Sequence, residues 1–197
     1  MVEIAVAMFL LIITPGPGVL SLAGVGAAFG FRKAVPYFNG LFAGNLFVYL
    51  IVATGLAALI LAEPFLRTLL LGVSLFYLLY LAARIAFAGS KIALIHAEVC
   101  PGFFAGFLLQ PINPKAYAVN TFFVTGFPIY PESYWIEIAM KFAVMMAVWI
   151  PVHLAWAFTG SRLHRLDLSP RAQRAINVGM AATMLIVVAI AMVSSAD

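Results

Sequence analysis

Two long apolar segments of this chain are each interrupted by a cluster of prolines. The first interruption is the sequence TPGP at residues 14–17, inside the apolar run 4–31. The second is QPINPK at residues 110–115, inside the run 101–127. A proline removes a backbone donor and clashes with the preceding turn, so a helix has to stop, bend or restart at each cluster. In lipid, the freed backbone groups are costly unless protein or water satisfies them. Paired interruptions at corresponding places in two half-chains are typical of a transporter's binding site.

The composition places these segments in a membrane. Hydrophobic residues make up 65% of the 197-residue chain and charged residues 9%, whereas soluble domains contain about 25% charged residues. A helix needs about 20 apolar residues to cross a bilayer, and six segments are long enough. They cover residues 4–31, 37–61, 65–87, 101–127, 134–159 and 175–193. We therefore predict an all-α integral membrane protein with six transmembrane helices, of which the first and fourth are broken.

Charged residues are distributed unevenly between the predicted loops. Basic residues follow the first, third and fifth segments: Arg32, Lys33, Arg84, Lys91, Arg162, Arg165, Arg171 and Arg174. Acidic residues lie near the opposite segment ends: Glu3, Glu63, Glu132, Glu137 and Asp197. Because basic loops stay in the cytoplasm, both termini are predicted to lie outside. Three spans per half is an odd number, so the halves 1–90 and 99–197 would form an inverted repeat within one transport domain, residues 1–197.

Several other interpretations are disfavoured by the same sequence. The acidic Glu3, and no basic residue, precedes the first apolar run, and no Ala-X-Ala-like site follows it, so we expect a retained first span and not a cleaved signal peptide. Cys100 is the single cysteine, which excludes an intrachain disulfide and a thiolate metal cluster. No cofactor or metal is expected. Basic residues in short loops between spans indicate membrane orientation rather than nucleic-acid binding.

The first interruption predicts a helix end inside the membrane. Pro17 suits the first position of a restarted helix, whose unpaired amides near Gly18 would carry the positive end of the helix dipole. Such an end binds anions, most simply a substrate carboxylate. A kink that packs against a neighbour and binds nothing is the structural alternative.

The second interruption places a charge near the middle of a span. Lys115 would cost about 3 kcal/mol or more there, so it should have a partner or a role. It would bind a carboxylate, or be satisfied by carbonyls freed at Pro111 and Pro114. Amide groups of Gln110, Asn113 and Asn120 add donors and acceptors: Asn113 and Asn120 would share one side of a continuous helix.

Further polar residues and glycines have a structural interpretation beside a functional one. Hydrogen bonding between helices is favoured over substrate contact for Asn45, and a packed histidine over a proton carrier for His153. Lys141 is predicted to extend its ammonium toward the outer membrane surface. The glycine pairs 26/30, 40/44 and 102/106 have the spacing that lets helices approach closely. They would pack within one chain or between two copies, which leaves a homodimer open.

The two interruptions resemble the hallmark motifs of a known family. The sequences TPGP at 14–17 and NPKA at 113–116 are similar to those of the lysine exporter/homoserine–threonine exporter family. So is the pattern at 171–179, which leads into a last segment rich in small residues. The resemblance covers the whole chain in length, segment number, motif order and spacing. It implies an exporter of amino acids or related small metabolites in the cytoplasmic (inner) membrane, driven by the proton gradient.

The resemblance also implies that the two motifs line a central cavity. The candidate substrate-binding residues are Thr14, Pro15, Gly16, Pro17, Gly18, Asn113, Pro114 and Lys115, with Asn45, Gln110 and Asn120 as further lining. One position departs from the family pattern, because Gly18 stands where the family often has Asn or Asp.

The distribution of acidic residues bears on the substrate. Asp and Glu are absent from the deep part of every predicted span, so a cationic side chain would enter the membrane without a carboxylate to meet it. A neutral zwitterion is therefore expected. Two alternatives to an exporter remain. One is a membrane-embedded enzyme, although the sequence has no Gly-X-Ser-X-Gly or His-Glu-X-X-His motif. The other is an assembly or regulatory protein that does not transport.

Overall fold

The protein is helical throughout the part of the chain that its computed structural model describes. That part comprises residues 2–14, 16–86, 99–126 and 128–164, with nine separate positions between 169 and 186. Its helices, in chain order, are α1 (Val2–Ile13), α2 (Pro17–Phe29), α3 (Phe31–Ala53), α4 (Leu56–Ala62), α5 (Pro64–Ala86), α6 (Phe103–Leu109), α7 (Pro114–Thr125) and α8 (Tyr134–His164). Pro15, most of the connection between the predicted halves and most of the sixth predicted segment lie outside the described residues.

Both predicted interruptions are present. The axis bends by 57° between Ala5–Ile13 and Pro17–Phe29, and α6 and α7 are separated by a turn at residues 110–113. Among the described helices, α3 and the Tyr134–Arg162 part of α8 are long and apolar enough to cross a membrane, and the bent pair makes a third crossing if it counts as one span. The described part of the chain is thus all-helical, and it contains at least two helices with the length and composition of membrane spans.

The second predicted segment has different boundaries. It was expected at 37–61, after a loop containing Arg32 and Lys33, but α3 already begins at Phe31. Gly30 alone separates it from α2, with a φ of 85° that glycine adopts without a steric penalty. A second left-handed glycine, Gly55 with φ 76°, then ends the segment early and starts the short α4.

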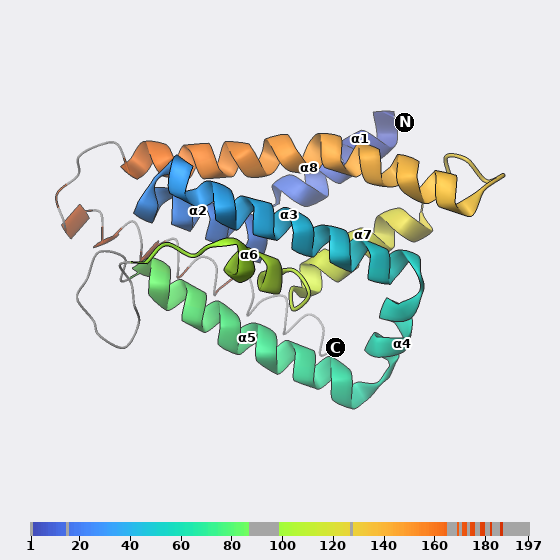
Figure 1. The fold of residues 1–197 in the computed structure, drawn as a ribbon, viewed down its shortest axis with the longest axis horizontal. Coiled ribbons are helices and arrows are strands. Elements are labelled where there is room, and N and C mark those ends of the chain that lie inside the picture. Colours follow the sequence, from blue (N-terminus) through green and yellow to red (C-terminus); the bar gives the residue numbers. More distant parts are fainter. Residues whose placement is uncertain are drawn as a thin grey trace.

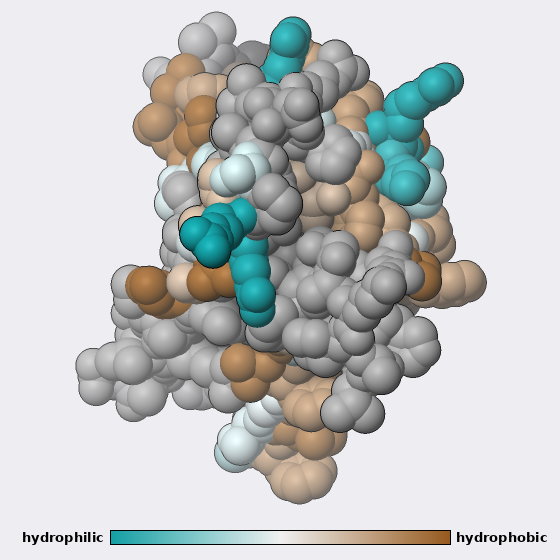
Figure 2. Space-filling view, turned by 90° about the vertical axis from the view of Figure 1, so that its left-hand side faces the viewer, coloured by the Kyte–Doolittle hydropathy of each residue, from teal (hydrophilic) through white to brown (hydrophobic). Residues whose placement is uncertain are grey.

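Figure 1 shows how these helices lie along the long axis of the molecule. The α1–α2 pair runs toward the end at which α3 begins, and the α6–α7 pair runs in the opposite direction (Figure 1). α3 begins and α8 finishes at this end (Figure 1). Arg32 and Lys33 are exposed in the first turn of α3 and Arg162 in the last turn of α8, so we call it the basic end. Figure 2 faces this end and shows hydrophilic groups projecting from it between hydrophobic surfaces. At the other end, the acidic end, α4 finishes and α8 begins (Figure 1). Glu63 caps α4, Glu137 lies in the first turn of α8, and Glu132 lies just before that helix.

Glycines bring α2 into backbone contact with α8 near the basic end. A Cβ added to Gly26 would lie 2.6 Å from the carbonyl oxygen of Ala157, and one added to Gly160 would overlap the carbonyl of Ala23. Real Cβ atoms do not approach backbone so closely, so these positions accept only glycine unless the helices separate. The extensive packing of α2 on α8 depends on this contact.

A second glycine contact joins α3 to α6. A Cβ on Gly40 or Gly44 would overlap the carbonyl of Phe103 or Phe107, and one on Gly106 would overlap the carbonyl of Tyr37. We call the two contacts the glycine seams. Four of the six glycines in the predicted pairs therefore pack within the chain. A Cβ on Gly102 would meet open space, and Gly30 forms the turn between α2 and α3.

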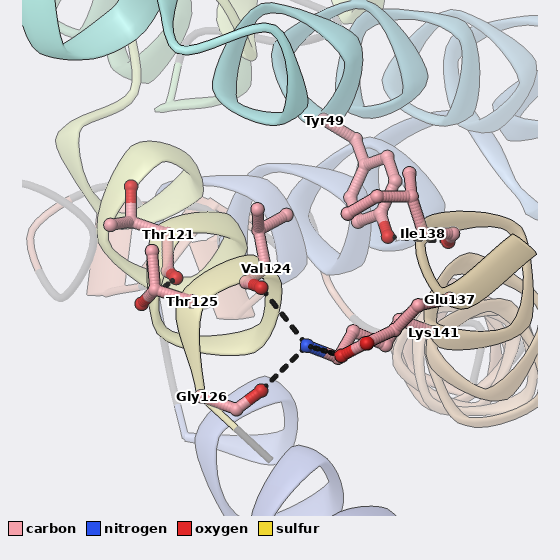
Figure 3. A network of polar contacts seen from close by, with 8 residues as sticks. All are labelled: Tyr49, Thr121, Val124, Thr125, Gly126, Glu137, Ile138 and Lys141. Atoms are coloured by element: carbon pink, nitrogen blue, oxygen red, sulfur yellow. Dashed lines mark hydrogen bonds and ion pairs between the residues drawn. The ribbon is translucent and has the colours of Figure 1, made fainter. Parts of the chain in front are cut away.

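The acidic end is held by polar side chains instead. Lys141 is 3% exposed: its Nζ donates to the carbonyls of Val124 (2.9 Å) and Gly126 (2.7 Å) and pairs with Glu137 at 2.7 Å (Figure 3). The expectation that Lys141 extends to the membrane surface is wrong, because the last turn of α7 presents carbonyls that lack intrahelical partners and attract its ammonium. Tyr49 adds a hydrogen bond to the carbonyl of Ile138 at 2.7 Å.

Candidate functional site

The two broken helices meet at Lys115. Its ammonium donates to the carbonyl of Thr14, which in an unbroken helix would accept from the amide of Gly18. The expected partners of Lys115 were a carboxylate or the carbonyls freed at Pro111 and Pro114, whereas this carbonyl belongs to the first interruption. Lys115 thus connects the two halves of the chain at the breaks that both contain.

The start of α7 positions Lys115. Asn113 is the N-cap, and its Oδ1 accepts a hydrogen bond from the amide of Lys115 at 3.1 Å. Pro114 occupies the first turn, where a missing amide hydrogen costs nothing. The stem of Lys115 lies over Gly16, since a Cβ there would be 2.7 Å from its Cδ and 3.2 Å from its Nζ. Gly16 has an extended backbone, so the close side chain, and not φ, explains the glycine.

The start of α2 leaves amides available in the interior of the protein. Gly16 is the N-cap and provides no side-chain hydrogen bond to the first turn, while Pro17 follows at the first helical position. Every residue of Pro17–Ala27 is buried. The first amides of a helix lack intrahelical partners and carry the positive end of its dipole. The predicted restarted helix is therefore present, with its amino end enclosed by protein.

A cavity lies between these two helix starts. The space in it that is open to the centre of a water-sized sphere is about 50 Å³, and one water needs about 10–15 Å³ by this measure. The polar lining side chains are Asn45, Gln110, Asn113, Lys115 and His153, and Gly16 and Gly18 contribute backbone. Ile12, Val19, Val119, Met145 and Trp149 provide most of the apolar lining. The lining comes from both halves of the chain.

The predicted site residues divide into two groups. Gly16, Gly18, Asn45, Gln110, Asn113 and Lys115 line the cavity. Thr14, Pro17, Pro114 and Asn120 are not part of the lining, and Pro15 lies outside the described residues. The hydroxyl of Thr14 donates to the carbonyl of Leu10 at 2.6 Å and so satisfies a group freed by the break.

Asn45 and Asn120 form a buried pair beside the cavity. Asn120 Nδ2 donates to Asn45 Oδ1 at 3.2 Å and to the carbonyl of Ala116 at 2.8 Å, which confirms the predicted hydrogen bond between helices for Asn45. The Nδ2 of Asn45 and the Oδ1 of Asn120 have no hydrogen-bond partner among the described residues. Buried polar atoms are rarely left so, and an unpartnered donor on a cavity-lining residue suits a bound acceptor.

His153 is the polar residue of the cavity lining that was placed outside the predicted site. It is 3% exposed, its ring stacks on that of Trp149 with centroids 3.6 Å apart, and its Nδ1 lies 2.9 Å from the Trp149 carbonyl. The expectation of a packed, hydrogen-bonded histidine is confirmed, but this histidine also lines the cavity. The sequence signal for His153 was a polar residue deep in an apolar segment, near Pro151. The sequence does not show which neighbouring helix its side chain faces.

Comparison with known proteins gives one match. The model of a family described as LysE type translocator matches residues 9–195, which is nearly the whole chain. No curated protein and no solved structure gave a significant match.

Proposed function

The chain belongs to the LysE type translocator family, and we propose that it is a secondary exporter of amino acids or related small metabolites across the cytoplasmic membrane, driven by the proton gradient. The observation that carries the proposal is the junction of two broken helices around one polar cavity, bridged by Lys115. Broken helices that meet at a cavity are typical of secondary transporters, because unpaired backbone groups inside a membrane are tolerated where they line such a space.

For the complete chain we propose six spans in one transport domain, arranged as inverted halves 1–90 and 99–197 with both termini outside. The opposite directions of α1–α2 and α6–α7 support the inversion (Figure 1). The packing is reciprocal as well, since α2 packs mainly on α8 of the second half and α6 mainly on α3 of the first. The separation of basic and acidic residues between the two ends supports the orientation.

A neutral zwitterion is the proposed substrate. Its carboxylate would bind at the amino end of α2, where it would meet the Lys115 ammonium and the unpartnered Nδ2 of Asn45. Lys115 is the one charged side chain in the described lining, so a carboxylate would compensate its charge, whereas a neutral carbonyl does so only in part. A neutral side chain would pack against Val19, Met145 and Trp149.

Transport into proteoliposomes tests the function. Vesicles containing the purified protein are loaded with labelled threonine or homoserine and challenged with excess unlabelled neutral, basic or acidic amino acids. We expect neutral amino acids to inhibit most strongly. Inhibition by lysine and arginine alone would contradict the zwitterion proposal. No transport of any amino acid would contradict the exporter proposal and favour the alternatives, a membrane-embedded enzyme or an assembly or regulatory protein.

A pair of lysine variants tests the site. Lys115→Met should reduce transport at least tenfold at normal abundance, because the carboxylate loses its charged partner. Lys33→Met is the matched control: it removes the same charge from an exposed position at the basic end and should transport normally. Equal transport by both variants would remove Lys115 from the site.

Cysteine labelling tests the orientation. Glu132→Cys and Arg32→Cys are placed at exposed positions of opposite ends, in a chain in which Cys100 is replaced by serine. A membrane-impermeant thiol reagent applied to intact cells should label position 132 and spare position 32. The reverse labelling would contradict the proposed orientation.

A further inference from the structure

We propose that Nε2 of His153 is the single acceptor that binds either the ammonium group of the substrate or the transported proton. The inference rests on the proposed export function and adds to it the residue at which the two fluxes are coupled. The tautomer of His153 is set by its hydrogen bond to Trp149. A carbonyl oxygen only accepts hydrogen bonds, so His153 Nδ1 carries the hydrogen that it shares with the Trp149 carbonyl. In the neutral ring, the lone pair is therefore on Nε2.

The position of Nε2 directs that lone pair toward the space above Gly18. A Cβ built on Gly18 would lie 3.7 Å from His153 Nε2 and 3.5 Å from the side-chain nitrogen of Gln110. No described residue makes a hydrogen bond to His153 Nε2. Because residue 18 has no side chain, the space between these two groups remains open to a ligand. Stacking on Trp149 and the bond at Nδ1 hold the ring in this orientation.

The cavity therefore has two ends of different character. Lys115 lies over Gly16, and His153 faces Gly18. Residues two apart in a chain have Cα atoms separated by at most about 7 Å, which is the scale of a small amino acid. The Lys115 end offers donors for a carboxylate, and the His153 end offers an acceptor for an ammonium. A zwitterion can engage both ends at once.

The charged groups around His153 favour a ligand that brings a carboxylate to Lys115 together with an ammonium group to Nε2. From α7, Lys115 lines the same cavity and repels a second cation. From α3, the hydroxyl of Tyr37 donates to Ser21 at 2.9 Å, and Arg32 and Lys33 are exposed at the basic end. Neither Ala5–Ile13 of α1 nor Pro17–Phe29 of α2 contains a charged or titratable side chain. This repulsion keeps a proton on Nε2 weakly bound and readily displaced, and a substrate carboxylate on Lys115 offsets the repulsion for the ammonium.

Competition for one lone pair yields antiport. An ammonium hydrogen and a free proton cannot occupy Nε2 together, so substrate binding from the cytoplasm displaces the proton to the cytoplasm. After the substrate leaves on the outer side, a proton from outside binds Nε2. One proton then moves inward for each zwitterion that moves outward, and the only bond made or broken is that between Nε2 and the proton.

Proton release on substrate binding tests this directly. Threonine or homoserine, whichever the wild type transports, is added to purified protein in weak buffer with a pH indicator. Because the proton competes with the substrate for Nε2, the wild type should bind substrate more weakly as the pH of the assay is lowered, and should release more protons per substrate bound, approaching one. His153→Gln keeps a hydrogen-bond acceptor but does not titrate, so it should bind more weakly and release no proton. His164→Gln, at the end of α8, is the matched control and should behave as the wild type.

Transport then separates this inference from the proposed function. In proteoliposomes, His153→Gln should exchange substrate several-fold more slowly than the wild type and should not respond to an imposed pH gradient. A variant that still responds as the wild type does, or a wild type that binds substrate without releasing a proton at any pH tested, would overturn the inference while leaving the export function intact. If His153→Gln is wholly inactive, proton release by the wild type decides. Absence of all transport by the wild type would instead overturn the proposed function.

Discussion

The basic and acidic ends of the molecule are closed by different kinds of contact. Near the basic end, one glycine seam brings the backbone of α2 against that of α8, and toward the middle of α3 the other seam brings α3 against α6. At the acidic end, α7, α8 and α3 are joined by a few polar side chains, chiefly Lys141, Glu137 and Tyr49. Separating closely packed helices loses all of their packing contacts together, which is costly. Breaking a few hydrogen bonds has a small net free-energy cost, because the same groups then bond to water. We therefore expect the acidic end to open more easily.

The largest effect should come from adding a side chain to a glycine seam. Gly40→Leu and Gly106→Leu would force atoms into the carbonyls of Phe103 and Tyr37, which are backbone and cannot move aside. We expect at least a tenfold loss of folded protein in the membrane, measured by fluorescence-detected size-exclusion chromatography. The control is Gly102→Leu, where a Cβ meets nothing within 4 Å and abundance should be normal. Normal abundance of all three variants would mean that the seams are not close contacts.

An intermediate effect is expected at Lys141. Lys141→Met would leave the carboxylate of Glu137 without its cation and two carbonyls of α7 without a donor. The carbonyls then lose a charged donor in a place where Lys141 itself is almost fully shielded from solvent. The expected result is a folded protein with a clearly lowered melting temperature. Adding Glu137→Gln should recover part of the loss, because the uncompensated charge is then removed. A melting temperature equal to that of the wild type would place Lys141 in water and contradict the buried pair.

The smallest effect is expected from a single hydrogen bond at the same end. Tyr49→Phe keeps the buried ring and removes only the bond from its hydroxyl to the Ile138 carbonyl. We expect a loss of about 1 kcal/mol in stability. If the acidic end opens first, this variant should also increase hydrogen exchange at the start of α8 more than at the glycine seams. Uniform exchange at both ends would remove the proposed difference between them.

Proline chemistry and segment length made much of the fold predictable. The breaks at 14–17 and 110–115 appear where the prolines lie, because a proline acts on its own helix whatever its neighbours are. The helices α5 and α8 cover the third and fifth predicted segments for a similar reason, since the length needed to cross a bilayer is fixed. The start of α3 was predicted too late, because a one-residue turn at Gly30 replaces the expected loop.

The candidate site was predictable only in part. Gly16, Gly18 and Lys115 could be named because motif residues and a deep charge stand out in an apolar chain. The partner of Lys115 could not be named, since the Thr14 carbonyl is 101 residues distant along the chain. The role of His153 was also hidden, because the side that a residue faces depends on how its helix is rotated against α2 and α7.

The sequence by itself determined that the chain is a helical membrane protein, that two of its helices are broken, and which residues are polar where lipid would exclude them. These properties follow from single residues and short runs: apolar length, missing amide hydrogens and the cost of a deep charge. Only the tertiary structure decided that Lys115 bridges both breaks, that glycines bring α2 against α8 and α3 against α6, that Lys141 is buried, and that His153 faces Gly18. Each of these depends on atoms from distant segments being brought within a few ångströms, and such distances are set by packing rather than by local preference.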